Sequence, residues 1–272
     1  FEACGRELKV AFCLGKLTKG VDEMKPKIAL QLWTIKEAMA ADFAGTLKAV
    51  KENGYDGVEF AGYQDFTATE IRHLLDENQL EVCASHIPFE KLSADLAGVM
   101  AFEKTIGNRR IVCPWLSFDN YQDWKAAFAT LDEIGKTLTE AGFEFYYHNH
   151  AHEFAEVPGS DILHYLTAHT SYVKLEVDLY WVAKAGVAVD EWLLDHAPKI
   201  GLLHFKDLTA DGTESTEIGH GVLPMKDYLV FAKEYQLPWL IVEQEAFLQY
   251  EPVEASRIDC DNLTALRDEV YA

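Results

Sequence analysis

The sequence predicts an α/β protein of the (β/α)8, or TIM, barrel class, and three observations lead to this prediction. Eight short apolar segments alternate with longer amphipathic segments from residue 27 onward. The short segments are apolar almost throughout, which is typical of parallel strands buried on both faces of a sheet. No glycine-rich phosphate-binding motif follows the first of them, which disfavours a dinucleotide-binding fold. The 272-residue chain also has the length of one such barrel.

The individual elements can be placed along the chain. Between the expected strands, apolar residues recur at intervals of three and four over 42–54, 67–79, 121–142 and 225–236, as in amphipathic helices. Thr67 and Glu70 have the spacing of a capping box that opens the second of these helices. Gly54 and Gly142 suit left-handed residues at helix C-termini. The expected strands are 27–33, 57–62, 81–87, 109–115, 143–149, 172–178, 201–207 and 238–244.

Residues 1–23 stand apart from this pattern. They show neither a helical nor a strand period, and they lack the long apolar run and small-residue cleavage site of a signal peptide. Met24 directly precedes the first expected strand, and we expect it to be the natural start. We therefore expect an N-terminal extension over residues 1–23 that is not part of the fold, and one barrel domain over residues 24–272. A genuine N-terminal arm is the alternative.

Composition and charge disfavour several classes of protein. The formal net charge is −21, and such an acidic surface repels a phosphate backbone, so we expect no nucleic-acid partner. No apolar run approaches the roughly 20 residues that span a bilayer, so we expect no membrane association. The five cysteines are scattered, without a Cys-x-x-Cys pair, which favours reduced thiols in the cytoplasm. A homo-oligomer is compatible with these features.

Polar side chains gather where the expected strands end. Residues 146–154, YYHNHAHEF, place three histidines and a glutamate within six residues directly after an aromatic strand. In a TIM barrel the active site lies at the C-terminal ends of the strands, so side chains there face one pocket. The residues at these ends are, in strand order, Gln31 and Trp33, Glu59, His86, Trp115, His148 and His150, Glu176 and Asp178, His204 and Lys206, and Glu243 and Glu245.

Four of these residues have the chemistry of a metal site. His148, Asp178, His204 and Glu243 come from the fifth to the eighth strand, at equivalent positions. Two imidazoles and two carboxylates suit one divalent ion such as Mn²⁺, Zn²⁺, Co²⁺ or Fe²⁺, and suit Mg²⁺ less well. Each residue alone also has a structural interpretation: a strand-end histidine often only donates a hydrogen bond, and Asp178 could cap the helix after it. Because all four residues lie at equivalent strand-end positions, a metal site is favoured over four separate structural roles.

Several segments resemble a known superfamily. GLLHFKD, LEVDLYWVAKAG, YHNHAHEF and WLIVEQE are similar to the xylose isomerase-like TIM-barrel superfamily, the sugar phosphate isomerase/epimerase family. It includes sugar isomerases and epimerases, inosose dehydratases and endonuclease IV, and the resemblance extends from Met24 to the C-terminus. In its ketose 3-epimerases, Glu, Asp, His and Glu on strands five to eight hold one divalent metal. The matching positions are His148, Asp178, His204 and Glu243.

His148 departs from that pattern. In the epimerases both metal-bound glutamates also act as the acid/base pair on opposite faces of the substrate. Here one of them is a histidine, and a metal-bound imidazole has no lone pair left for a proton. The two-glutamate mechanism therefore does not carry over intact, and Glu153 or Glu176 could supply the missing carboxylate. Inosose dehydratase-like members also carry a histidine-rich stretch on this strand, which keeps dehydration as an alternative.

The expected chemistry is proton transfer through an enediolate. A metal that bridges a carbonyl and the adjacent hydroxyl lowers the cost of removing the α-proton, and Glu243 can accept that proton. Lys206 shares the side-chain direction of His204 and so can face the pocket, although it could instead be a surface lysine paired with Asp207. We expect Lys206, Glu153 or a metal-bound water, in that order, to complete the proton transfer.

Other strand-end residues are expected to contact the substrate. Trp33 and Trp181 could stack on the apolar face of a sugar, although large aromatic residues also fill barrels. We expect substrate contacts from Glu59, His86 and His150 as well. His152 should point to solvent.

The sequence therefore predicts a metal-dependent isomerase or epimerase that acts on a sugar or related keto-polyol through a metal-stabilised enediolate. The alternatives are an inosose dehydratase-like lyase and a non-catalytic sugar-binding barrel. An endonuclease is disfavoured, because it needs more metal ligands and a basic groove. The substrate, its phosphorylation and the choice among isomerisation, epimerisation and dehydration cannot be read from the residues, and neither can the identity of the metal.

Overall fold

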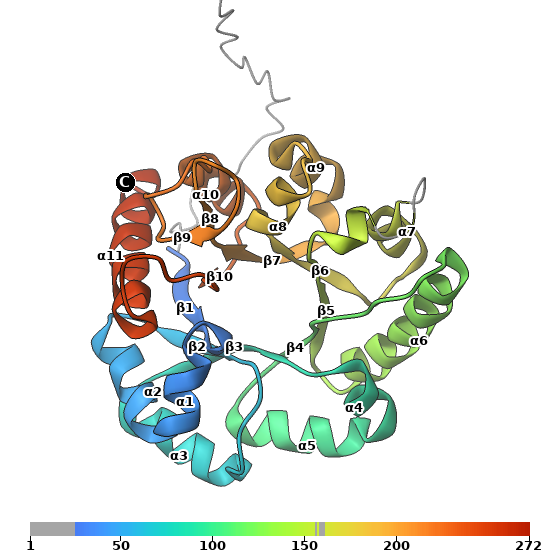
Figure 1. The fold of residues 1–272 in the computed structure, drawn as a ribbon. Coiled ribbons are helices and arrows are strands. Elements are labelled where there is room, and N and C mark those ends of the chain that lie inside the picture. Colours follow the sequence, from blue (N-terminus) through green and yellow to red (C-terminus); the bar gives the residue numbers. More distant parts are fainter. Residues whose placement is uncertain (1–24, 156, 158–160) are drawn as a thin grey trace, which may run out of the picture.

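The chain folds into a closed eight-stranded parallel barrel surrounded by helices (Figure 1). The computed structural model describes residues 25–155, 157 and 161–272. Around the barrel the strands follow the order β1-β10-β7-β6-β5-β4-β3-β2, and all neighbours are parallel. The predicted (β/α)8 barrel is confirmed. The expected extension over residues 1–23 lies outside the described residues and stays a prediction.

The barrel strands fall within the eight expected segments, apart from Ile200 at the start of the seventh. A further two-stranded antiparallel sheet, β8 (Asp207–Leu208) with β9 (Ser215–Thr216), follows the seventh barrel strand. The barrel strands are β1 (Lys27–Gln31), β2 (Gly57–Phe60), β3 (Glu81–His86), β4 (Arg110–Cys113), β5 (Glu144–His148), β6 (Lys174–Asp178), β7 (Ile200–Phe205) and β10 (Trp239–Val242).

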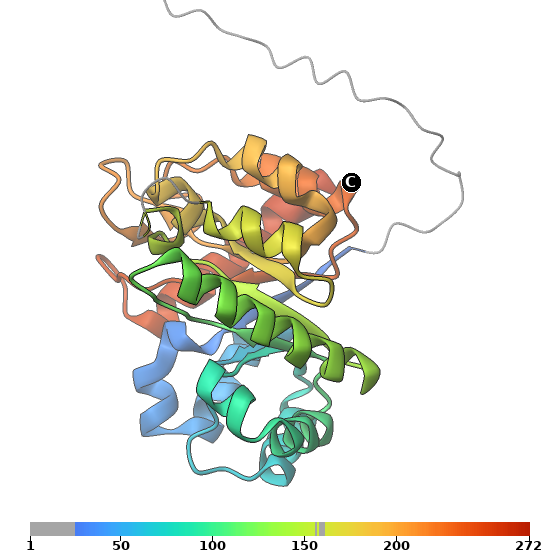
Figure 2. The ribbon, with the colours of Figure 1, turned by 90° about the vertical axis from the view of Figure 1, so that its right-hand side faces the viewer.

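Helices cover the outside of the strands, as the side view shows (Figure 2). The described part of the chain also contains three short 3-10 helices, η1 (Leu32–Ile35), η2 (His152–Phe154) and η3 (Ala197–Lys199). The α-helices are α1 (Lys36–Ala41), α2 (Phe43–Glu52), α3 (Ala68–Asn78), α4 (Phe89–Ala94), α5 (Leu96–Ile106), α6 (Tyr121–Glu140), α7 (Ile162–His169), α8 (Leu179–Lys184), α9 (Val189–His196), α10 (Met225–Glu234) and α11 (Pro252–Val270). No helix among the described residues is long and apolar enough to cross a membrane.

The expected helix ends are confirmed. Thr67 and Glu70 form a capping box at the start of α3. Gly54 and Gly142 follow α2 and α6 with φ angles of 99° and 87°, in the left-handed region where a side chain would be strained. The first strand is shorter than expected, because the Gln31 side chain accepts a hydrogen bond from Trp33 N and so starts η1.

Thr67→Ala should lower the free energy of unfolding by about 1 kcal/mol. The Thr67 hydroxyl accepts from Glu70 N at 3.3 Å, and the Glu70 carboxylate accepts from Thr67 N at 2.8 Å. The substitution removes the first of these bonds and leaves the Glu70 N–H without its side-chain acceptor. Thr130→Ala in α6 is the control, because the Thr130 hydroxyl donates only to the carbonyl of Ala126 in its own helix. Chemical denaturation measures both variants, and equal effects would contradict the capping role.

The barrel interior has an apolar layer beneath a polar one. Side chains two residues apart on a strand share a face. The side chain two residues after each interior apolar residue therefore also points inward. Tyr146 precedes His148 in this way, Leu202 precedes His204, and Ile241 precedes Glu243. The apolar layer packs as one cluster: Ala29, Cys83, Ala84, Val112, Tyr146, Leu202, Trp239 and Ile241. The polar side chains at the C-terminal strand ends therefore lie directly above a closely packed apolar layer.

Candidate active site

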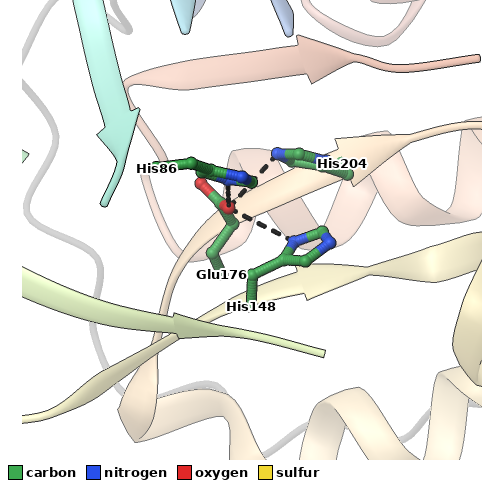
Figure 3. Close-up of side chains that lie close together, drawn as sticks. All are labelled: His86, His148, Glu176 and His204. Atoms are coloured by element: carbon green, nitrogen blue, oxygen red, sulfur yellow. Dashed lines mark hydrogen bonds and ion pairs between the residues drawn. The ribbon is translucent and has the colours of Figure 1, made fainter. Parts of the chain in front are cut away.

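Three histidines surround one buried carboxylate at the C-terminal end of the barrel (Figure 3). The Glu176 Oε2 atom lies 2.7 Å from His86 Nε2, 3.3 Å from His148 Nδ1 and 3.3 Å from His204 Nε2. His86 and His148 end β3 and β5, whereas Glu176 and His204 lie within β6 and β7. Burial raises the pKa of Glu176, but the neighbouring His204 and His86 outweigh it and hold that pKa well below its usual range. Glu176 is therefore ionised within the cluster.

A second carboxylate lies behind this cluster. Glu59 Oε2 lies 2.7 Å from His204 Nε2 and 3.3 Å from His86 Nε2, and it accepts a 2.7 Å hydrogen bond from the Gln31 amide. Burial, together with the negative charge of Glu176, raises the pKa of Glu59 to about 7. The Oε1 atoms of both glutamates are buried and have no hydrogen-bond partner among the described residues.

Lys206 forms the other half of the polar layer. Its buried Nζ lies 3.0 Å from Asp178 Oδ2, 3.0 Å from Glu243 Oε2 and 3.3 Å from Glu245 Oε2. His204 Nδ1 lies 3.2 Å from the same Glu243 oxygen, so His204 connects this group to the three-histidine cluster. Burial would lower the pKa of Lys206, but Asp178 and Glu243 outweigh it and raise that pKa.

The structural alternative for Lys206, a surface pair with Asp207, is wrong. Lys206 is fully buried and faces the pocket side of the barrel. Asp207 points the other way, and its carboxylate accepts hydrogen bonds from the backbone N–H groups of Leu208, Gly219, Gly221 and Leu223. Asp207 thereby fixes the loop after β7, and Lys206 carries its charge into the site.

Two carboxylates beside Lys206 have pKa values that are shifted in opposite directions. Burial raises the pKa of Asp178 to about 6, against the opposing effect of Lys206. For Glu243 burial also raises the pKa, but Lys206 and His204 outweigh it, so the pKa lies well below its usual range. Glu243 is ionised at neutral pH, and it becomes a stronger base only when Lys206 moves away or loses its charge.

Asp178 serves as the expected helix cap while facing the site. Its Oδ1 atom accepts a 3.0 Å hydrogen bond from Trp181 N at the start of α8, and its Oδ2 atom faces Lys206. The Asn149 side chain accepts a 3.1 Å hydrogen bond from Asp178 N. The cap and this bond hold the carboxylate in one orientation.

The donors present fit a divalent metal ion. The candidate ligand atoms of His148, Asp178, His204 and Glu243 all lie within 4.8 Å of one another, and all four residues are buried. Imidazole nitrogen with carboxylate oxygen suits Mn²⁺, Fe²⁺, Co²⁺ or Zn²⁺. The Lys206 ammonium lies between Asp178 and Glu243, so these carboxylates are already arranged around a positive charge. A set of His86, His148, Glu176 and His204 satisfies the same distance criterion.

A cavity of about 990 Å³ opens above these groups. Its lining includes many of the predicted site residues, namely Trp33, His86, His148, His150, Trp181 and Glu243. Glu59, Asp178, His204 and Lys206 do not line it and lie buried behind its wall. For Glu59 this position supports a role in holding His204 and His86 instead of a direct substrate contact.

Sequence reasoning assigned no role to several residues of the cavity. Trp115 and Glu245 line it. Their positions at or just after the ends of expected strands already indicated that they face the pocket. Tyr63 and Gln64 also line it, from the loop between β2 and α3. Nothing in the residue pattern distinguishes that loop from the others.

Glu153 and His152 lie differently from what was expected. The buried Glu153 carboxylate accepts hydrogen bonds of 2.8 Å from the Tyr147 hydroxyl and from His150 N, so it fixes the turn after β5 and does not line the cavity. A catalytic role for Glu153 is not supported by this position. The expectation that His152 points to solvent is wrong, because its ring packs 4.2 Å from Trp115 and its Nε2 lies 2.8 Å from Leu116 O.

Solved structures with the same fold include proteins described as isomerases, epimerases and a dehydratase. A sugar phosphate isomerase/epimerase from Parabacteroides distasonis ATCC 8503 superposes with a TM-score of 0.79 at 20% identity, covering 90% of this chain and 96% of that chain. An L-ribulose 3-epimerase gives 0.66 at 13% identity, covering 90% and 96%. A probable 3-DHS dehydratase from Bacillus anthracis gives 0.68 at 13% identity, covering 88% and 98%. At identities this low, the TM-scores show that the folds are alike and show nothing more specific.

The sequence comparison is more specific about the family. No curated protein matches the chain in sequence at a significant level. The family model of the xylose isomerase-like TIM barrel matches residues 47–266, which is most of the barrel. The predicted resemblance is confirmed, and the chain belongs to the xylose isomerase-like TIM barrel family.

Proposed function

We propose that the protein is a metal-dependent isomerase or epimerase that acts on a sugar or related keto-polyol through an enediolate. The observation that carries this proposal is the position of Glu243. Its carboxylate lines the cavity, contacts both Lys206 and His204, and belongs to the set of four buried residues whose ligand atoms lie within 4.8 Å. A carboxylate beside a cation at the floor of a cavity is suited to removing a proton next to a carbonyl.

His148, Asp178, His204 and Glu243 would hold the metal. When bound, a divalent cation supplies Lewis-acid stabilisation of the negative charge that develops on the substrate oxygens. Asp178 is suited to this role because its orientation is fixed by the α8 cap. His204 is suited because Glu59 and Glu176 hold its other ring nitrogen, and such partners orient a metal-binding imidazole.

The chain's own residues have different parts in the proton transfer. Glu243, which lines the cavity, accepts the proton α to the substrate carbonyl. Lys206 lies buried behind the cavity wall, and its raised pKa keeps it charged, so its positive charge favours the negative charge that develops beside Glu243. Glu243 and His148 are nearly buried, so little of either side chain is open to bulk water. His86 and His150 line the same cavity and can orient substrate hydroxyl groups.

The placement of Lys206 beside Glu243 bears on the type of reaction. Their charged atoms are 3.0 Å apart, and of the two Glu243 alone lines the cavity, so one base reaches the substrate from one side. A single base is enough for proton return to a neighbouring carbon, which is isomerisation, and for removal of the α-proton that precedes loss of a β-hydroxyl, which is dehydration. Epimerisation needs a group on the opposite face, for which His86 and His150 are the cavity-lining candidates. Dehydration is therefore the second candidate function.

Restoration of activity by metal tests the proposed function. Protein treated with a chelator and then dialysed should not convert any member of a panel of ketoses and inososes, and added Mn²⁺, Co²⁺ or Zn²⁺ should restore turnover of at least one. NMR of the products separates an isomer or epimer from a product that has lost water. Turnover at an equal rate with and without metal would contradict the proposal, and sugar binding without turnover under all metals would favour a binding protein.

A further inference from the structure

The cavity is larger than one sugar ring requires. Its volume of about 990 Å³ lies at the upper end of the roughly 300–1,000 Å³ of pockets that enclose drug-sized ligands. Glu243 and His148 are 5% and 2% exposed, whereas Trp33 and Trp115 are 46% and 52% exposed. The proton-transfer groups thus lie at the closed end and the two tryptophans at the mouth. A ring held against Glu243 leaves the outer part of the cavity unfilled.

Aromatic rings form a continuous wall from the closed end to the mouth. The Lys206 Nζ lies 5.0 Å from the centroid of the Trp181 ring. The ring centroids of Trp181 and His150 are 5.6 Å apart, and those of His150 and Trp115 are 4.7 Å apart. His152 also lines the cavity, and its ring centroid lies 4.2 Å from that of Trp115, so the two rings support each other. The outer part of the wall is therefore a supported aromatic surface.

The mouth is aromatic on more than one side. Trp33 follows β1 and Trp115 follows β4, and these strands are not neighbours in the barrel. Half-exposed aromatic side chains at the opening of a cavity are typical of a surface that a ligand covers. Lys91 is the one lysine among the described residues that line the cavity, and no arginine is among them. A phosphate group is therefore a poor match for the mouth, whereas a flat ring is a good one.

We propose that the mouth is a second subsite, which binds a ring attached to the reacting ring. The substrate class would be a glycoside-like compound, in which a polyol ring reaches Glu243 and a second ring with a flat apolar face stacks on Trp115 and Trp33. This inference rests on the proposed function for the placement of the reacting ring. The second ring is recognised by stacking and by exclusion of water from the tryptophans.

Matched pairs of phenyl and methyl glycosides test the subsite. The two members of a pair share the sugar and differ only in the second ring. Ligand-observed NMR titrations with pairs built on several hexoses should show phenyl glycosides binding about 3- to 10-fold more tightly to the wild type. Trp115→Ala should remove most of this preference, and Trp33→Ala part of it. Cellobiose in the same titrations distinguishes a sugar as second ring from an aromatic one.

Tyr172→Ala is the control variant. Tyr172 is 39% exposed but lies two residues before the start of β6, at the opposite end of the barrel from the cavity, so its loss should leave the preference unchanged. Equal affinities within every pair, no measurable binding of any phenyl glycoside, or a preference that survives in the Trp33→Ala/Trp115→Ala double variant would overturn the subsite. Because binding is measured without turnover, a wrong reaction at Glu243 would leave the phenyl preference intact, and a wrong subsite would leave the metal-dependent turnover intact.

Discussion

Glu243→Gln is expected to reduce turnover by about 10²–10⁴-fold, the usual contribution of a general base. Glutamine keeps the shape of the side chain and an oxygen that can face Lys206 and His204, but it cannot accept the α-proton. Steady-state kinetics on any substrate found with the panel measures the loss. We expect the loss in kcat, because the substituted group acts in the transition state and binds the ground state little.

Glu245→Gln is the matched control for this variant. Glu245 also lies near Lys206, at 3.3 Å, and also lines the cavity. Its side chain is 32% exposed, compared with 6% for Glu243, and it is not among the four clustered ligands. We expect its turnover to fall by less than about tenfold, since exposed ion pairs contribute little. Full activity of Glu243→Gln, or equal losses in both variants, would show that Glu243 is not the base.

Asp178→Asn should abolish stoichiometric metal binding while leaving the barrel folded. Asparagine caps a helix about as well as aspartate, so the hydrogen bond from Trp181 N is kept and only the negative charge is lost. Removing a direct ligand should weaken metal affinity beyond the roughly 10- to 100-fold typical of its supporting residues. Elemental analysis of purified protein, with circular dichroism as a check of the fold, measures the effect.

Asp161→Asn provides the comparison, because Asp161 caps α7 in the same way, through His164 N, and lies outside the metal cluster. Its metal content should equal that of the wild type. If Asp178→Asn retains full metal content, the ion is held elsewhere. The set of His86, His148, Glu176 and His204 would then be the first alternative to examine, through Glu176→Gln.

The fold could be predicted because each level of the sequence pointed to the same answer. Eight apolar segments, capping signals such as Thr67 with Glu70, and glycines after helices agree with one another, and such agreement specifies a single fold. The exact end of β1 could not be predicted. It depends on the Gln31 side chain, which caps η1 through Trp33 N, and many strand-end glutamines make no such bond.

The candidate site was predictable in its membership and less so in its arrangement. Strand alternation places both Glu176 and Asp178 inward, but it does not show that Glu176 lies among three histidines while Asp178 faces Lys206. That division depends on side-chain conformations, of which the one at Asp178 is fixed by the α8 cap. The position of Glu153 could not be predicted for a similar reason, because its bonds to Tyr147 and His150 N arise from the geometry of the turn, which spacing does not reveal.

Deuterium incorporation from D₂O is the most direct test of proton transfer by Glu243. Metal-loaded wild-type protein incubated with an active substrate should place deuterium on the carbon α to the carbonyl, because the proton that Glu243 removes can exchange with solvent before it returns. Glu243→Gln, assayed at equal metal content, should show no incorporation above the uncatalysed rate. Undiminished incorporation in Glu243→Gln, or turnover of the wild type with complete retention of the substrate hydrogen, would contradict solvent-exchanging proton removal by this carboxylate.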